Sequence, residues 1–238
     1  MDELYYDLHM HSCLSPCGDA DMTPYNLVNM AAINGLEVIA LTDHNTARNC
    51  PAAIRAGEEA GLLVLPGMEL TTSEEVHIVC LFSEVETALA FSDYVYERLP
   101  DIENMPGIFG EQVLMDEADN DLGRLSKLLI NATSVSVMEV RGLVEVYGGF
   151  CYPAHVDRSS NSILANLGEI PPECGFTAAE ISKTGDDAAL MQAHAILQNM
   201  KRLHSSDAHY LPDIADPIHR LRVEARTPAG VLSALRRG

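Results

Sequence analysis

Short apolar runs alternate with segments of helical periodicity along this chain, and helix start and stop signals mark the junctions. Tyr5 to His9 predicts a first strand. Thr23-Pro24 then supplies an N-cap and a proline at the first helical position for a helix that ends before Gly35, and residues 36–41 predict a second strand. This order of strand, helix and strand is typical of α/β folds built on a parallel sheet.

The same alternation continues toward the C-terminus. Further strands are predicted at 62–65, 77–82, 150–153 and 178–181, and further helices at 51–61, 85–98, 135–147 with Ser134 as its N-cap, 186–200 and from Thr227-Pro228 onward. The run from Ile78 to Leu81 is predicted to be buried on both faces, which favours a strand inside a parallel sheet. A length of 238 residues is within the range of one α/β barrel, and no linker rich in Gly, Pro or Ser divides the chain. We therefore expect a single domain over residues 1–238.

Residues 100–123 interrupt this alternation. Pro106, Gly107 and Gly110 break any helical or strand pattern there. We interpret the segment as a small inserted lid or cap, and the sequence leaves open whether it reaches a substrate.

The chain carries a formal net charge of −20. An acidic surface repels phosphate backbones, so long nucleic acid is not an expected substrate. No run approaches the ~18 apolar residues that a membrane span requires, and the N-terminal segment lacks the basic start of a signal peptide. We therefore expect a cytoplasmic protein whose six cysteines are free thiols.

Imidazole and carboxylate side chains follow the ends of the predicted strands. His9 and His11 close the first strand, and because alternate residues of an extended chain project to the same side, both can bind one cation. Further side chains of this chemistry lie just past later strands, at Asp43-His44, Glu69, His155 and Asp207-x-His209. In a barrel of parallel strands these ends converge on one face. A mixture of imidazoles and carboxylates suits zinc, manganese or iron in an open catalytic site rather than a closed structural zinc site.

Two cysteines follow shortly after His11. Cys13-x-x-x-Cys17 has the form of half a zinc site, but the chain has no second cysteine pair with ligand spacing to complete it. We interpret both residues as loop thiols.

In this order, the chemistry-bearing residues resemble the motifs of the polymerase and histidinol phosphatase (PHP) family of hydrolases. The motifs are His9-x-His11, Thr42-Asp43-His44-Asn45, Gly67-Met68-Glu69, His77, Pro153-Ala154-His155 and Asp207-x-His209. The resemblance implies a distorted, TIM-like (β/α)7 barrel and a site for two to three divalent metal ions, which relatives use to cleave phosphomonoesters or phosphodiesters.

The resemblance also implies how the ligands are divided among the ions. One ion would be held by His9, His11, Glu69 and Asp207; a second, bridged by Glu69, by His77 and His155; and a third by His44, His209 and Asp19. Asp21 is an alternative to Asp19, because the spacing after His11 is slightly longer than is usual in the family. His77 begins its predicted strand rather than ending it, so its place in the set depends on the resemblance alone. Asp43 and Asn45 are interpreted as residues that orient His44.

Cationic side chains also follow the predicted strand ends. Arg158 follows His155, Lys183 follows the strand at 178–181, and Arg48 follows His44. Of these, Arg158 and Lys183 are the residues that we expect to bind a substrate phosphate. Glu69 and Asp207 would act as metal ligands in catalysis, and His209 is a candidate proton donor.

These observations predict a metal-dependent phosphoesterase that hydrolyses a small phosphorylated metabolite or nucleotide through a metal-activated water. The chain has no Gly-x-Ser-x-Gly elbow and no P-loop, which disfavours a serine hydrolase or an NTPase. Three alternatives stay open: a short-oligonucleotide exonuclease or phosphodiesterase, a carbon–nitrogen hydrolase, and a metal-binding regulatory domain without activity. The sequence does not indicate an oligomeric state.

Overall fold

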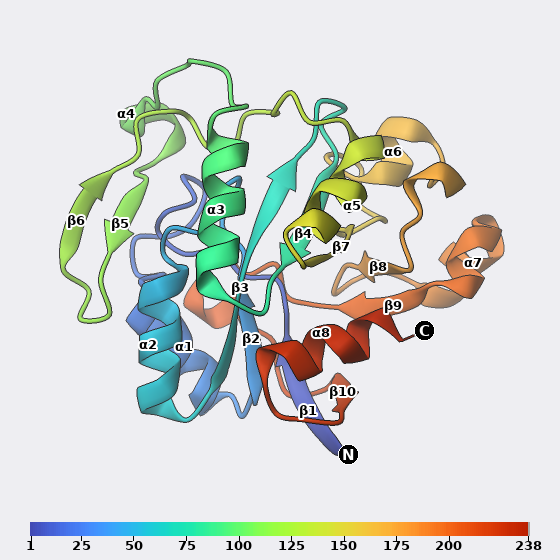
Figure 1. Ribbon diagram of the computed structural model, residues 1–238, viewed down its shortest axis with the longest axis horizontal. Helices are drawn as coiled ribbons and strands as arrows, with labels where there is room; N and C mark the ends of the chain where they lie inside the picture. The colour runs from blue at the N-terminus through green and yellow to red at the C-terminus, as the bar shows by residue number, and fades with distance from the viewer. Residues whose placement is uncertain (238) are drawn as a thin grey trace.

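Five of the six predicted strands assemble into a curled sheet in the computed structural model, which describes residues 1–237 (Figure 1), and the predicted strand at 178–181 lies in a separate sheet. Within these residues, the main sheet contains, in spatial order, β10 (Arg220–Val223), β1 (Asp2–Asp7), β2 (Val38–Leu41), β3 (Leu63–Thr71), β4 (His77–Leu81) and β7 (Phe150–Pro153). Two smaller sheets pair β8 (Ala178–Ile181) with β9 (Lys201–His204) and β5 (Val113–Met115) with β6 (Asp121–Arg124). The predicted α/β class is confirmed, as a mixed fold with a curled half-barrel sheet.

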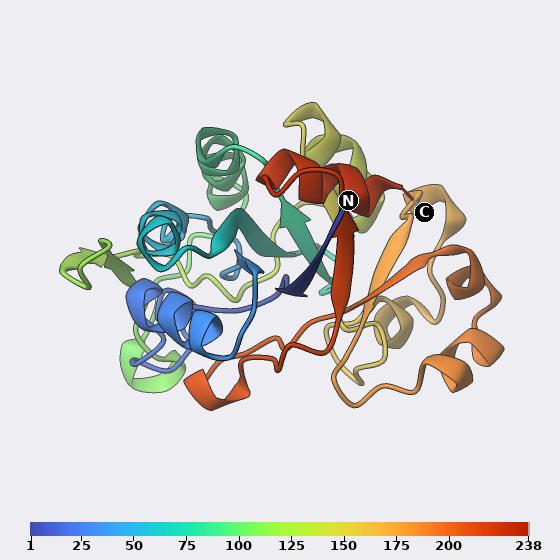
Figure 2. The ribbon, with the colours of Figure 1, turned by 90° about the horizontal axis from the view of Figure 1, so that it is seen from below.

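Helices surround the strands, as the view from below shows (Figure 2). The helices are α1 (Pro24–Ile33), α2 (Cys50–Ala60), α3 (Val85–Tyr96), α4 (Pro106–Phe109), α5 (Val137–Val146), α6 (Ile163–Leu167), α7 (Asp187–Ala193) and α8 (Pro228–Arg236). Short 3-10 turns lie at Pro172–Cys174, Ala195–Asn199 and Leu211–Asp213. Within residues 1–237, none of the helices has the length and apolar character needed to cross a membrane.

Apolar side chains fill both sides of the main sheet. Alternate residues of β2 divide between them: Ile39 and Leu41 pack beneath α1, α2 and α3, whereas Val38 and Ala40 belong to the inner cluster together with α8. Helix α8 lies at the amino-terminal end of β7, where the Arg236 guanidinium donates to the Gly148 and Gly149 carbonyls at 2.8 and 2.9 Å. Polar side chains occupy the opposite end of the main sheet, where the parallel strands finish.

The direction of β4 differs from the prediction. Strands β1, β2 and β3 are parallel, but β4 runs antiparallel to both β3 and β7. The expected burial of β4 is confirmed, whereas the inference of a parallel strand from that burial is wrong, because a strand covered on both faces can run in either direction. In the observed register His77 lies opposite Thr71, so the first residue of β4 is beside the last residue of β3. A side chain at the start of β4 therefore shares an edge with those at the ends of the parallel strands.

Residues 100–123 form α4 and the β5–β6 hairpin (Figure 1). The segment is attached to the loop that follows His11, because the Val113 backbone N–H donates to the Cys13 carbonyl at 3.0 Å. Asn49, at the start of α2, adds two hydrogen bonds: its side chain donates to the Val113 carbonyl at 3.1 Å and accepts from the Met115 N–H at 3.0 Å.

Two helix starts test the capping predictions. Thr23 caps α1 as predicted, with its hydroxyl accepting from the Asn26 N–H at 3.2 Å. The predicted cap at Ser134 is wrong, because Ser136 begins α5 in a capping box with Glu139. The Ser136 hydroxyl also donates to a Glu74 carboxylate oxygen at 2.7 Å.

We expect Ser136→Ala to lower the free energy of unfolding by about 1–2 kcal/mol, because it removes the cap of α5. Ser134→Ala is the matched control, since Ser134 is exposed and caps no helix, and it should change stability by less than about 0.5 kcal/mol. Urea unfolding followed by circular dichroism measures both, and equal midpoints for the two variants would contradict the assignment of the cap.

Candidate metal centre

The predicted metal ligands meet at the edge of the sheet where the parallel strands end. His9 and His11 follow β1, His44 follows β2, Glu69 lies near the end of β3, His77 begins β4, His155 follows β7, and Asp207 and His209 follow β9. Apart from His209, which is half-buried, these residues are buried. Backbone bridges join the segments, pairing Met10 with Ala208 and His44 with Glu69. The strand ends thus bring together residues that are far apart in the sequence.

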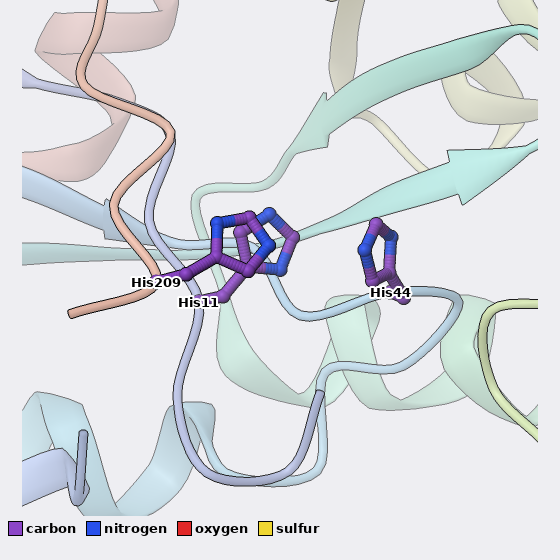
Figure 3. A group of neighbouring side chains, drawn as sticks. All are labelled: His11, His44 and His209. Carbon is purple, nitrogen blue, oxygen red and sulfur yellow. The ribbon is translucent and has the colours of Figure 1, made fainter. Parts of the chain in front are cut away.

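Ligand atoms fall into three groups whose members lie within 4.8 Å of one another. The groups are His9, His11, Glu69 and Asp207; His44, Glu69 and His77; and His11, His44 and His209. Figure 3 shows the last of these, in which the rings of His11 and His209 stack with centroids 4.3 Å apart and His44 lies to one side. The first group has the same members as the first predicted ion site. The other two differ from prediction, because His44 joins Glu69 and His77, and His155 lies outside the three groups.

Glu69 is shared by two of the groups. Its Oε1 atom lies 2.9 Å from His77 Nδ1, 3.1 Å from His155 Nε2 and 3.2 Å from His9 Nε2. Its Oε2 atom lies 2.9 Å from His44 Nδ1 and 3.3 Å from His11 Nε2. Each oxygen thus contacts imidazoles of both groups, His9 and His77 at Oε1 and His11 and His44 at Oε2, so this one carboxylate lies between the two groups and can contribute to both.

Both buried carboxylates of the cluster are held in the ionised form. Burial opposes ionisation of Glu69, but the charges of His77, His9 and His44 hold its pKa well below the usual range. Burial likewise opposes ionisation of Asp207, whereas His9 and a hydrogen bond from His11 lower its pKa. A buried carboxylate without a compensating positive charge is costly. The cluster therefore favours cations.

Several polar atoms of the cluster are buried without a hydrogen bond of good geometry. Within the described residues they include His44 Nδ1 and Glu69 Oε2, which face each other at 2.9 Å, together with His155 Nδ1 and Asp207 Oδ1. In addition, His9 Nε2 and His11 Nε2 approach each other to 3.2 Å. Most buried polar groups in proteins are hydrogen-bonded, and an orphaned donor or acceptor costs about 1–3 kcal/mol. Convergent nitrogen and oxygen lone pairs of this kind fit divalent metal ions of the zinc, manganese or iron type.

Asp19 lies outside the three groups. Its backbone N–H donates to the His209 carbonyl at 2.9 Å, and its carboxylate accepts from the Asp21 N–H at 2.9 Å.

Cys17, which the sequence suggested to be a simple loop thiol, lines a cavity of about 410 Å³ together with His44, His77 and His209. Desolvation opposes ionisation of Cys17, but the charge of His44 and hydrogen bonding from His209 and His44 lower its pKa to about 5.

Glu180 is a site residue that the sequence interpretation missed. It is buried in β8, and its Oε1 accepts from His9 Nδ1 at 2.9 Å and from the His155 N–H at 3.1 Å. Donation from Nδ1 leaves Nε2 of His9 as the atom that faces Glu69 and Asp207. The sequence does contain a feature that could have identified Glu180, because it is the charged residue within the otherwise apolar strand Ala-Ala-Glu-Ile.

A second buried network orients His11 and His44. The Ser15 hydroxyl lies 3.0 Å from His11 Nδ1, accepts from the His44 N–H at 3.1 Å and donates to Asp43 at 2.8 Å. Asp43 also accepts from the Ser12 N–H and hydroxyl, both at 2.7 Å. Asp43 therefore acts on both histidines through Ser15.

Left-handed backbone conformations occur within the cluster. His155 has φ of 27° and Asp207 has φ of 51°, a region that residues other than glycine rarely adopt. Asn45, with φ of 53°, is held there by its side chain, which donates to the Leu129 carbonyl at 2.6 Å and accepts from the Thr71 N–H at 2.9 Å. Strain of this type is retained where the surrounding structure enforces it, which is common at functional sites.

Two of the three cationic candidates lie at the rim of the cluster. Arg158 is half exposed and its Nη1 lies 2.6 Å from Asp207 Oδ2. Lys183 lines a cavity of about 370 Å³ with Arg158, His209 and Cys17. The Arg48 guanidinium instead donates to the exposed Asp93 carboxylate at 2.8 Å.

Comparison with protein families gives a match over residues 7–159 to the model described as the PHP domain. Among curated proteins, a 5'-3' exoribonuclease of Haemophilus influenzae is 39% identical over 79 residues, which are 32% of this chain and 28% of that protein. A PolC-type DNA polymerase III of Listeria monocytogenes is 31% identical over 156 residues, 59% of this chain and 10% of the polymerase. The chain thus matches only a minor part of the length of these relatives.

Among solved structures, the lesion-specific endonuclease PfuEndoQ from Pyrococcus furiosus superposes with a TM-score of 0.72 at 16% identity, covering 99% of this chain and 56% of that one. A structure titled as a putative metal-dependent phosphoesterase from Bifidobacterium adolescentis superposes with a TM-score of 0.59 at 20% identity, covering 96% of both chains. At these identities the likeness is one of fold.

Glu180→Ala is expected to weaken metal binding by about 10–100-fold, because it removes the acceptor that fixes the His9 tautomer. Glu180→Gln keeps an oxygen acceptor, so its loss should be smaller. Competition against a chromogenic zinc chelator measures the affinity, with Glu173→Ala, an exposed carboxylate variant, as the control. Affinity unchanged in Glu180→Ala would show that this residue does not position His9.

Proposed function

The chain belongs to the PHP domain family, and we propose that it is a metal-dependent phosphoesterase acting on a small phosphorylated metabolite or nucleotide. The observation that carries this proposal is the buried Glu69 carboxylate, with imidazoles facing each of its oxygens and orphaned ligand atoms around it. Two to three divalent ions, zinc, manganese or iron, would be held by the three groups of side chains. When bound, such ions polarise phosphoryl oxygens and lower the pKa of water toward ~7.

The remaining roles fall to side chains at the rim. Arg158 and Lys183 would bind the substrate phosphate, and they are cations in a chain whose net charge is −20. His209 is less buried than the other histidines of the cluster and lines two of the cavities beside Asp207, which supports a role in protonating the leaving oxygen. Cavities of about 370 and 410 Å³ suit a small phosphate ester.

Finer features of the fold are part of this proposal. We propose that the curled sheet and the β8–β9 pair make up a distorted (β/α)7 barrel in a single domain over residues 1–238. The approach of β9 to β1 supports this, because the His204 N–H donates to the Tyr6 hydroxyl at 3.3 Å and the Leu8 N–H donates to the Ser205 hydroxyl at 3.2 Å. Residues 100–123 would serve as a lid, since the segment lines a cavity of about 500 Å³ with Cys17 and Asp19.

A second candidate substrate is a short oligonucleotide. The matched proteins include one named as a 5'-3' exoribonuclease and one titled as a lesion-specific endonuclease. Cleavage of a nucleic acid end would use the same ligands and the same rim cations, whereas the acidic charge of the chain disfavours long duplexes.

A hydrolysis panel of phosphomonoesters, dinucleotides, cyclic phosphates and labelled oligonucleotides tests the reaction class. Glu69→Gln should lower kcat/KM by about 100-fold or more, because the negative charge shared by two groups of ligands is lost.

Arg158→Ala and Lys183→Ala should each lower kcat/KM by about 10–100-fold, because each removes one charge-assisted hydrogen bond to the substrate phosphate. Arg48→Ala is the matched control and should retain wild-type activity, since Arg48 pairs with Asp93 away from the cluster.

The pattern of turnover separates the alternatives. Monoester turnover supports the favoured substrate class, and length-dependent oligonucleotide cleavage without monoester turnover supports the second. Full metal loading without hydrolysis of any member of the panel would replace both with a regulatory domain.

A further inference from the structure

The loop between His11 and α1 brings a thiol to the group formed by His11, His44 and His209. We propose that Cys17 is the fourth protein ligand of the ion held by these histidines, in the place that the sequence assigned to Asp19. The inference rests on the metal centre of the proposed function and specifies its chemistry, because a thiolate ligand makes this position selective for zinc or another thiophilic ion over manganese.

Two consecutive turns set the course of the loop. The Ser15 N–H donates to the Ser12 carbonyl at 3.1 Å, and the Gly18 N–H donates to the Ser15 carbonyl at 2.8 Å. Glycine is required at position 18, because a Cβ there would lie 2.4 Å from the Ser12 carbonyl oxygen. The Asp19 N–H then donates to the His209 carbonyl at 2.9 Å, which ties the loop to the segment after β9. Cys17 is therefore held beside His209.

The Cys17 side chain lines cavities that are also lined by two of the three histidines. It lines one cavity with His44 and His209 and a second with His209. It lies outside the set of atoms within 4.8 Å of one another, so binding requires the thiol to turn toward the histidines. Cys17 is exposed, which leaves its rotamer free to change.

The three-histidine group is one ligand short of a protein-bound tetrahedral ion. It also contains no anionic side chain, whereas Glu69 belongs to both of the other groups. Asp19 is a weaker candidate, because its carboxylate is already engaged by the Asp21 N–H and lines the neighbouring cavity with Gly110 and Arg124. The remaining cysteines are buried, so that Cys17 is the exposed thiol of the described chain.

Cobalt(II) substitution tests the proposal through an optical signal that does not depend on activity. The wild-type protein loaded with cobalt should show a near-ultraviolet thiolate-to-cobalt charge-transfer band. Cys17→Ser should lose this band and retain cobalt bound elsewhere in the cluster, whereas Asp19→Asn, which keeps the oxygen acceptor for Asp21, should retain it. A wild-type protein that binds cobalt without the band, or a band that persists in Cys17→Ser, would overturn the proposal while leaving the phosphoesterase intact. Failure to bind cobalt at all would overturn both.

Alkylation of the wild-type protein provides a test that needs no variant. In chelator-treated protein, iodoacetamide should modify Cys17 in preference to the buried cysteines. Zinc should slow this reaction by about tenfold or more, because a metal-bound thiolate is a poor nucleophile. Peptide mass spectrometry measures the rate, and equal rates with and without zinc would contradict ligation by Cys17.

Discussion

The arrangement at the carboxyl edge of the sheet depends on one buried negative charge. Glu69 is completely buried, and its two oxygens are surrounded by the nitrogens of His9, His11, His44, His77 and His155. Its backbone is fixed from both directions, since its N–H donates to the Thr42 carbonyl and its carbonyl accepts from the Asn45 N–H. A charge in this position destabilises the fold unless cations compensate it, so the site and its ions form one unit.

The fold supplies the geometry for this cluster by mixing strand directions. Parallel strands bring the residues that follow β1, β2 and β7 to one edge. The antiparallel β4 contributes from its first residue, His77, and this explains why a ligand can begin a strand in a site otherwise built from strand ends. Buried carboxylates behind the ligands then fix ring orientations, as Glu180 does for His9 and Asp43 does for His11 through Ser15.

Much of the fold and most of the ligand set could be predicted from the sequence, because strand periodicity and strand ends are local properties. The direction of β4 could not, since burial on both faces is compatible with either orientation. The membership of the second and third groups also differs from the prediction, because it depends on how far each side chain reaches across the edge. For the same reason Cys17 was interpreted as a loop thiol, and Glu180 was overlooked within an apolar strand. The role of residues 100–123 stays a prediction.

Anomalous diffraction from crystals of the protein, with data collected at the zinc, iron and manganese absorption edges, would show whether metal ions flank Glu69. We expect two or three peaks, with two of them on either side of the Glu69 carboxylate at about 2.0–2.3 Å from the facing nitrogen and oxygen atoms. The absence of any peak at Glu69, in protein prepared without chelator and resupplied with these metals, would contradict this expectation. The histidine cluster would then be a buried polar network rather than a metal centre.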